Sequence, residues 1–230
     1  RLADALQVPA SERERFIHAA RGEQRVEGLA MPEAAQPGPA GNILPVAGEL
    51  IGREAEMALI QTRLDDPDCR LLTIVGAGGM GKTRLALAAA AGAASRFPDG
   101  AWAVMLAAAE CSEMLLSSLA RALGLSVPVD SDLQAQIQFY LRNRTALIVL
   151  DNFEQLLEAT RTVAALLDAA PRIKILVTSR ERLNLGEEWL LPLDGLAVVD
   201  GDEQGSAALQ LFRARAHRVR PGFPESMEEI

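Results

Sequence analysis

Two kinds of hydrophobic pattern alternate along this chain. The first is a short, almost unbroken apolar run rich in β-branched residues, which is typical of a strand buried on both faces of a parallel sheet. The second is a longer segment with apolar residues three or four positions apart, which is typical of a helix packed by one side. The predicted strands are residues 71–75, 101–106, 146–151, 173–178 and 189–193. The predicted helices are residues 50–64, 83–90, 112–123, 131–143 and 206–218.

Because strands and helices alternate, the pattern predicts a doubly wound α/β domain built on a parallel sheet. Pro192 favours an edge position for the last strand, since proline cannot donate a ladder hydrogen bond. Near the N-terminus, Ser11 and Glu14 fit the capping box of a short helix, and a stretch rich in proline and glycine follows. The predicted parts are a helical tail of an upstream domain at residues 1–27, a linker at 28–47, the main domain at 48–200 and the start of a helical domain at 201–230.

Composition and charge narrow the function classes. The net charge of −8 argues against this chain holding DNA by itself, because phosphate contacts need a basic face. No apolar run approaches the about 18 residues of a membrane span, and no signal-peptide pattern is present. Cys69 and Cys111 are too few for a disulfide scaffold and lack metal-ligand spacing, which favours a reducing cytoplasm. The start at Arg1 rather than at Met predicts a piece of a longer protein.

The strongest chemical signal is the stretch GAGGMGKT at residues 76–83, which fits the phosphate-binding pattern G-x-x-x-x-G-K-[ST]. A predicted strand precedes it and a predicted helix follows it, as a phosphate loop requires. Glycines allow positive φ and close backbone approach, so successive N–H groups and the helix N-terminus face an anion. Lys82 would reach the β- and γ-phosphates, and the Thr83 hydroxyl would ligate Mg²⁺. A chance match is expected in roughly one chain of this length in a hundred.

Asp151 ends an apolar strand, at the edge where open α/β sheets place their ligands. We interpret it as the second Mg²⁺ residue, acting through the metal's water shell; the alternative is a helix N-cap for the segment from Glu154. Asn152 stands where many such ATPases carry a second carboxylate, and it can orient a water but cannot take its proton. The sequence therefore predicts slow turnover, unless Glu154 or a partner supplies the base.

Arg180 follows the strand at 173–178, at the same predicted edge of the sheet. There it can form charge-assisted hydrogen bonds with a γ-phosphate, and only while that group is present. The alternative is an ordinary solvated arginine. Arg180 is therefore a candidate for the residue that distinguishes ATP from ADP.

Four motifs in this order resemble the signal-transduction ATPases with numerous domains, and specifically their NB-ARC branch in bacterial transcriptional regulators. The resemblance covers about residues 48–220 and is carried by LIGREAE at 50–56, GAGGMGKT at 76–83, LIVLDN at 147–152 and ILVTSRERL at 175–183. It implies a P-loop NTPase fold of three layers, α/β/α, with five parallel strands in the order 2-3-4-1-5. It also implies that residues 51–53 flank the adenine and that Arg180 is the nucleotide sensor.

The resemblance implies that this is an ATP/ADP switch with weak, slow ATPase activity, which regulates transcription and self-associates in its ATP state. DNA would be bound only through an upstream helix-turn-helix domain. The alternative is a turnover ATPase, such as a motor or loader; a GTPase is disfavoured because no Asn-Lys-x-Asp motif occurs. The predicted nucleotide-binding residues are Ile51, Gly52, Arg53, Gly76, Ala77, Gly78, Gly79, Met80, Gly81, Lys82, Thr83, Arg84 and Arg180. The predicted metal residues are Thr83 and Asp151, and the predicted catalytic residues are Lys82, Asp151, Glu154 and Arg180.

Overall fold

The structure is a computed structural model that describes residues 41–46, 48–125, 132–196 and 206–220. All of these residues belong to one compact unit. The predicted helical tail at 1–27 and most of the predicted linker at 28–47 lie outside the described residues. The same is true of most of the segment from 194 to 205 and of the end of the chain.

The centre of the domain is a five-stranded parallel sheet in the order β2-β3-β4-β1-β5, which confirms the predicted strand order. β4 lies between β1, which leads into the glycine loop, and β3, which ends at Asp151. β5 is an edge strand, which accommodates Pro192 because a proline has no N–H to donate to a second neighbour. Pro192 pairs with Val75 by register, and the next residue, Leu193, donates its N–H to the Val75 carbonyl at 2.7 Å. The strands are β1 Leu71–Val75, β2 Ala101–Met105, β3 Leu147–Asp151, β4 Lys174–Ser179 and β5 Glu188–Pro192.

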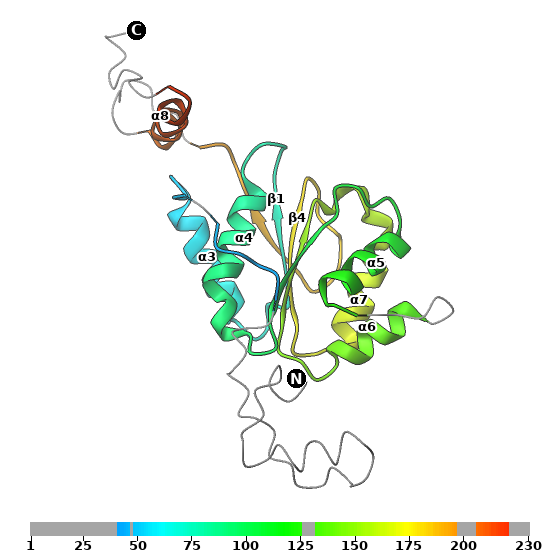
Figure 1. Ribbon diagram of the computed structural model, residues 1–230. Coiled ribbons are helices and arrows are strands. Elements are labelled where there is room, and N and C mark those ends of the chain that lie inside the picture. The colour runs from blue at the N-terminus through cyan, green and yellow to red at the C-terminus, as the bar shows by residue number, and fades with distance from the viewer. Residues whose placement is uncertain (1–40, 47, 126–131, 197–205, 221–230) are drawn as a thin grey trace, which may run out of the picture. The chain divides into compact units, whose positions relative to one another are not determined.

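Helices cover both faces of the sheet, so the fold has the three layers that the family resemblance implied (Figure 1). On one face lie α3 Glu54–Asp65 and α4 Lys82–Ala93, and on the other lie α5 Ser112–Ala122, α6 Leu133–Leu141 and α7 Thr160–Ala169. Each face has its own buried apolar cluster, because successive strand residues point to opposite sides. A further helix, α8, spans Ala207–Val219.

α7 is not among the helices predicted from the sequence. After β3 the chain first forms two 3₁₀ turns, at Phe153–Gln155 and Leu157–Ala159, and only then continues as α7. Its buried residues Val163, Leu166 and Leu167 do have helical spacing. The irregular entry hides the start of this helix, although its apolar stripe is visible in the sequence.

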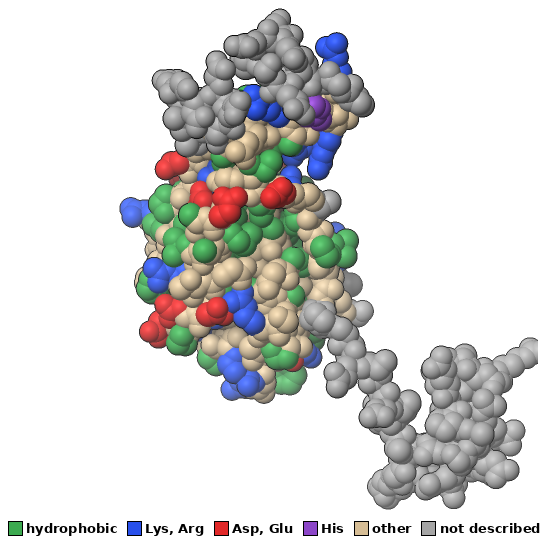
Figure 2. Space-filling view, turned by 90° about the vertical axis from the view of Figure 1, so that its left-hand side faces the viewer, with side chains coloured by type: hydrophobic (Ala, Val, Ile, Leu, Met, Phe, Trp, Pro, Cys, Tyr) green, Lys and Arg blue, Asp and Glu red, His purple; other side chains and the backbone are tan. Residues whose placement is uncertain are grey.

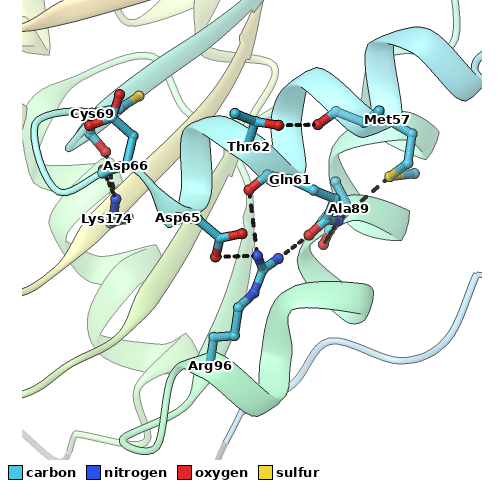
Figure 3. A network of polar contacts seen from close by, with 10 residues as sticks. Met57, Gln61, Thr62, Asp65, Asp66, Cys69, Ala89, Arg96 and Lys174 are labelled. Atoms are coloured by element: carbon cyan, nitrogen blue, oxygen red, sulfur yellow. Dashed lines mark hydrogen bonds and ion pairs between the residues drawn. The ribbon is translucent and has the colours of Figure 1, made fainter.

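Polar contacts fix α3 against α4 (Figure 3). The Gln61 Nε2 atom donates to the carbonyl of Ala89 at 2.9 Å, and Arg96, just after α4, donates to the side chains of Gln61 and Asp65. Below α3, Lys174 at the start of β4 donates to the Asp66 and Cys69 carbonyls. Burial lowers the pKa of Lys174 and raises the pKa of the Cys69 thiol. These contacts hold α3, which precedes the glycine loop in the chain, against α4 and the start of β4.

The end of the predicted linker is not free chain but lies along the outer edge of β2. Gly41 forms a parallel bridge with Ala101, and the Asn42 side chain both accepts from the Ala103 N–H at 2.6 Å and donates to its carbonyl at 2.9 Å. A β-carbon on Gly41 would lie 2.0 Å from the Ala101 oxygen, so only glycine fits there. Gly41 and Asn42, which the prediction placed in the linker, thus contact the edge of the sheet.

Figure 2 looks onto the side covered by α3 and α4, where acidic, basic and hydrophobic side chains are interspersed. Such a face is not the continuous basic stripe that DNA binding needs. None of the described helices combines the length and the apolar character that crossing a membrane would require.

Candidate functional site

The glycine loop connects β1 to α4 and has the backbone shape expected of a phosphate loop. Gly79 and Gly81 have φ of 81° and 88°, in the left-handed region that favours glycine. Gly81 is the N-cap of α4, and its carbonyl accepts from the Leu85 N–H at 2.9 Å. A β-carbon built on either glycine meets no described atom within 4 Å. The loop therefore presents its backbone and the N-terminus of a helix to open space, which suits an anion.

Lys82 is buried and folds back onto this loop. Its Nζ donates to the carbonyl of Gly76 at 2.7 Å and to that of Ala77 at 2.9 Å. The Lys82 ammonium group thus lies against the loop, where its positive charge would neutralise part of the charge of a bound polyphosphate. Thr83 follows it in the first turn of α4.

Asp151 is almost completely buried at the end of β3, and a threonine of the neighbouring strand holds it. The Thr178 hydroxyl donates to Asp151 Oδ1 at 2.6 Å and accepts from the Asn152 N–H at 3.0 Å. The 3₁₀ turn that begins at Phe153 has no side-chain cap, so Asp151 does not act as the N-cap considered above. The carboxylate is oriented by the sheet, not by a helix.

The chain turns sharply after Asp151 and brings Glu154 to Arg180. Asn152 adopts a left-handed conformation, with φ 63° and ψ 50°, which asparagine tolerates better than most residues. Glu154 Oε1 then lies 3.1 Å from Arg180 Nε. A β-carbon placed on Gly78 would lie 3.6 Å from Arg180 Nη2, so the same guanidinium also borders the glycine loop.

A cavity of about 350 Å³ opens beside the glycine loop. Three parts of the chain line it: the segment before α3, the loop with the first turn of α4, and α8 with the residue Leu196. Its mixture of apolar walls and a few polar groups is typical of a small-molecule site. The lining residues are Glu49, Leu50, Ile51, Arg53, Gly79, Met80, Gly81, Arg84, Leu196, Ala208, Leu211 and Arg215. Larger surface cavities next to Phe139 on α6 contain none of the predicted site residues.

Arg53 lines this cavity and connects the chain segments that form its wall. Its side chain donates to the carbonyls of Met80 at 3.2 Å and Asp194 at 2.6 Å, and it pairs with Glu56 at 2.6 Å. Arg53 thereby joins the start of α3 to the glycine loop and to the chain after β5. Gly52 has φ 69°, and a β-carbon on it would lie 2.3 Å from the Ala207 β-carbon, so its backbone also seats α8.

The described residues fit a nucleoside triphosphate or diphosphate with Mg²⁺. The loop supplies backbone donors and an ammonium group for the phosphates, and the apolar residues Leu50, Ile51 and Leu211 can cover a base. Thr83 and Asp151 offer hydroxyl and carboxylate oxygens, the ligand type that Mg²⁺ prefers. The chain therefore contains the donor set that the predicted cofactors need.

The structure collects the predicted site residues at one edge of the sheet, around the loop and the ends of β3 and β4. Sequence reasoning missed Thr178, which orients Asp151, and the contributions of Leu196, Ala208, Leu211 and Arg215 to the cavity wall. The spacing of the last three on a helix was a usable signal, since it places them on one side of α8. Thr178 carries no such signal, because its role depends on the pairing of β3 with β4.

Comparison with known proteins gives a family and several relatives. Residues 53–186 match the model described as the NB-ARC domain. A Mycobacterium tuberculosis protein named as an HTH-type transcriptional regulator is 39% identical over 155 residues, which is 67% of this chain and 17% of that protein. The regulatory protein AfsR of Streptomyces griseus is 34% identical over 176 residues, 71% of this chain and 17% of that protein. The chain thus spans about a sixth of the length of these regulators.

Among solved structures, a STAND signal-transduction ATPase with a tetratricopeptide repeat sensor from Pyrococcus horikoshii matches 84% of this chain and 28% of its own. The sequence identity is 19% and the TM-score is 0.41. Cdc6p from Pyrobaculum aerophilum matches 64% of this chain and 46% of its own, with 16% identity and a TM-score of 0.49.

Proposed function

Because the chain belongs to the NB-ARC family of P-loop ATPases, we propose that it is an ATP/ADP-controlled molecular switch with slow ATP hydrolysis. Its place would be the nucleotide-binding module of a transcriptional regulator. The alternative on the same fold is an ATPase whose purpose is turnover.

The observation that carries the proposal is that the cavity is shared between the glycine loop and α8. A nucleotide bound there touches the α/β core on one side and Ala208, Leu211 and Arg215 on the other. Ligands can shift a conformational equilibrium only through contacts that differ between states. A site built across two elements is suited to such a shift, because a change in the position of either element changes the contacts with the ligand.

The residues around the phosphates have separate roles in this proposal. The backbone N–H groups of the loop and the Lys82 ammonium bind the phosphates, and Arg180 adds hydrogen bonds when a γ-phosphate is present. Thr83 and Asp151 would hold Mg²⁺, which neutralises phosphate charge. Thr178 keeps Asp151 in place through its 2.6 Å hydrogen bond.

Slow hydrolysis follows from the residue after Asp151. Asn152 is not a base, and its left-handed backbone and the N–H bond to Thr178 fix the turn rather than prepare a proton transfer. A measured turnover number with excess Mg·ATP separates the two functions. A rate well below one per minute supports a switch, and sustained turnover of many per second supports a motor or loader, in line with ordinary enzyme rates.

DNA binding and self-association complete the proposal. The similar regulators carry the name HTH-type, and the net charge of −8 makes this chain itself a poor DNA ligand, so DNA would be bound through a separate domain. We propose self-association in the ATP state. Light scattering on the protein in Mg·ADP and in a non-hydrolysable Mg·ATP analogue tests it; equal mass in both contradicts it.

Two substitutions test the nucleotide site directly. Lys82→Ala is expected to abolish binding of both nucleotides in isothermal titration calorimetry, and unchanged affinity would contradict the proposal. Arg180→Ala is expected to leave ADP affinity nearly intact while it weakens binding of an ATP analogue. Equal losses for both nucleotides would show that Arg180 does not distinguish them.

A further inference from the structure

Arg180 and Glu154 form an ion pair at the edge of the glycine loop, and the two partners are unequally buried. The Glu154 side chain is 18% exposed and the Arg180 side chain is 65% exposed. Glu154 stands on a 3₁₀ turn whose neighbours Phe153 and Leu156 are buried in the core. Glu154 is thus the partner fixed by packing, whereas Arg180 depends on the ion pair to restrict its side chain.

The pairing uses only one edge of the guanidinium. Glu154 Oε1 contacts Nε at 3.1 Å, while Nη2 is the atom nearest to Gly78 in the glycine loop. A guanidinium is a flat fork whose donors point in fixed directions, so fixing Nε also fixes where the Nη groups point. Here Nη2 lies next to Gly78, in the loop that would bind the phosphates.

We infer that Glu154 is a positioning residue, which holds Arg180 so that its Nη groups face the terminal phosphate of ATP. The inference rests on the function proposed above. An exposed arginine without such an anchor samples many rotamers, and ordering it on binding would consume part of the γ-phosphate interaction. With the anchor in place, the preference for ATP over ADP is built into the free protein.

The second carboxylate oxygen does not change this assignment. Glu154 Oε2 is buried and has no hydrogen-bond partner among the described residues. A carboxylate oxygen that is buried without a donor is stabilised by a nearby positive charge, and Arg180 supplies that charge. Glu154 was also considered as the base that takes a proton from water, and the experiment below distinguishes that role from the positioning of Arg180.

The experiment measures the affinities for Mg·ADP and for Mg·AMP-PNP, a non-hydrolysable ATP analogue, by calorimetry. Glu154→Ala is expected to lower the preference for AMP-PNP roughly 1.5-fold to fivefold, the range for a partly exposed charge pair. Glu154→Gln keeps the size of the side chain but removes the charge of the ion pair, so it is expected to lose the preference as well. Glu158→Ala is the matched control, because this exposed glutamate on the next 3₁₀ turn is expected to change nothing.

A double-mutant cycle shows whether Glu154 acts through Arg180. Adding Glu154→Ala to Arg180→Ala is expected to lower the preference no further than Arg180→Ala alone. Glu154→Asp, which keeps the charge but withdraws the carboxylate, provides a second test if the alanine variant does not fold. It is expected to lose preference as well.

Two results would overturn the inference. A higher preference for AMP-PNP in Glu154→Ala would mean that the carboxylate competes with the phosphate for Arg180. Unchanged preference, with ATP hydrolysis lost in both Glu154→Ala and Glu154→Gln, would assign the base role instead. Either result leaves the proposed function intact as long as Lys82→Ala abolishes nucleotide binding.

Discussion

Thr178→Val is expected to destabilise the protein, because the hydroxyl of Thr178 joins two groups that the valine would leave without a partner. Thr178 is completely buried. Its hydroxyl donates to Asp151 Oδ1 at 2.6 Å and accepts from the Asn152 N–H at 3.0 Å. Valine has nearly the same shape, so the change removes the hydrogen bonds without leaving a cavity.

The magnitude follows from these two contacts. Leaving a buried donor or acceptor unsatisfied costs about 1–3 kcal/mol each, and the extra methyl group returns about 0.8 kcal/mol. The expected loss in the free energy of unfolding is therefore about 1–5 kcal/mol. For a domain of this size that corresponds to a melting temperature lower by roughly 2–20 °C.

The chain supplies a matched control on the neighbouring strand. Thr73 of β1 is also completely buried, but its Oγ1 has no hydrogen-bond partner within the described part of the chain. Thr73→Val therefore removes an unsatisfied hydroxyl and is expected to be neutral or stabilising by up to about 1 kcal/mol. Urea unfolding followed by circular dichroism measures both variants. Equal losses for the two would refute the reasoning, because shape and not hydrogen bonding would then dominate.

Three further predictions concern the cavity and the cysteines. Arg53→Met is expected to lower the free energy of unfolding by about 2–3 kcal/mol, since two carbonyls lose a charged donor. A change below about 0.5 kcal/mol in urea unfolding would show that the contacts of Arg53 with these carbonyls do not stabilise the fold. Arg215→Ala is expected to weaken Mg·ADP and Mg·ATP binding equally, by roughly threefold to tenfold in calorimetry, while Arg220→Ala, outside the cavity lining, changes neither. Burial raises the pKa of the Cys69 thiol, so at pH 8 iodoacetamide is expected to label exposed Cys111 in the native protein and Cys69 only after unfolding. If peptide mass spectrometry finds Cys69 labelled as fast as Cys111 in the native protein, the prediction is wrong, because the residues that bury Cys69 would then not protect it.

The sequence by itself determined the features that depend on neighbouring residues. Apolar runs predicted the five strands, and glycines followed by Lys82 and Thr83 predicted a phosphate loop, because strand burial and positive φ impose local requirements on residue type. The strand order came from the family resemblance, and the sheet confirms it. The irregular entry into α7 escaped prediction, since 3₁₀ turns leave no regular period.

Only the tertiary structure decided which side chains meet. Thr178 and Asp151 are 27 residues apart in the chain, and their hydrogen bond exists because β3 and β4 pair in one particular register. The contact of Arg180 with Glu154 likewise depends on the left-handed turn at Asn152. A register or a turn is set by the packing of the whole sheet, so no pattern of nearby residues could reveal these pairs.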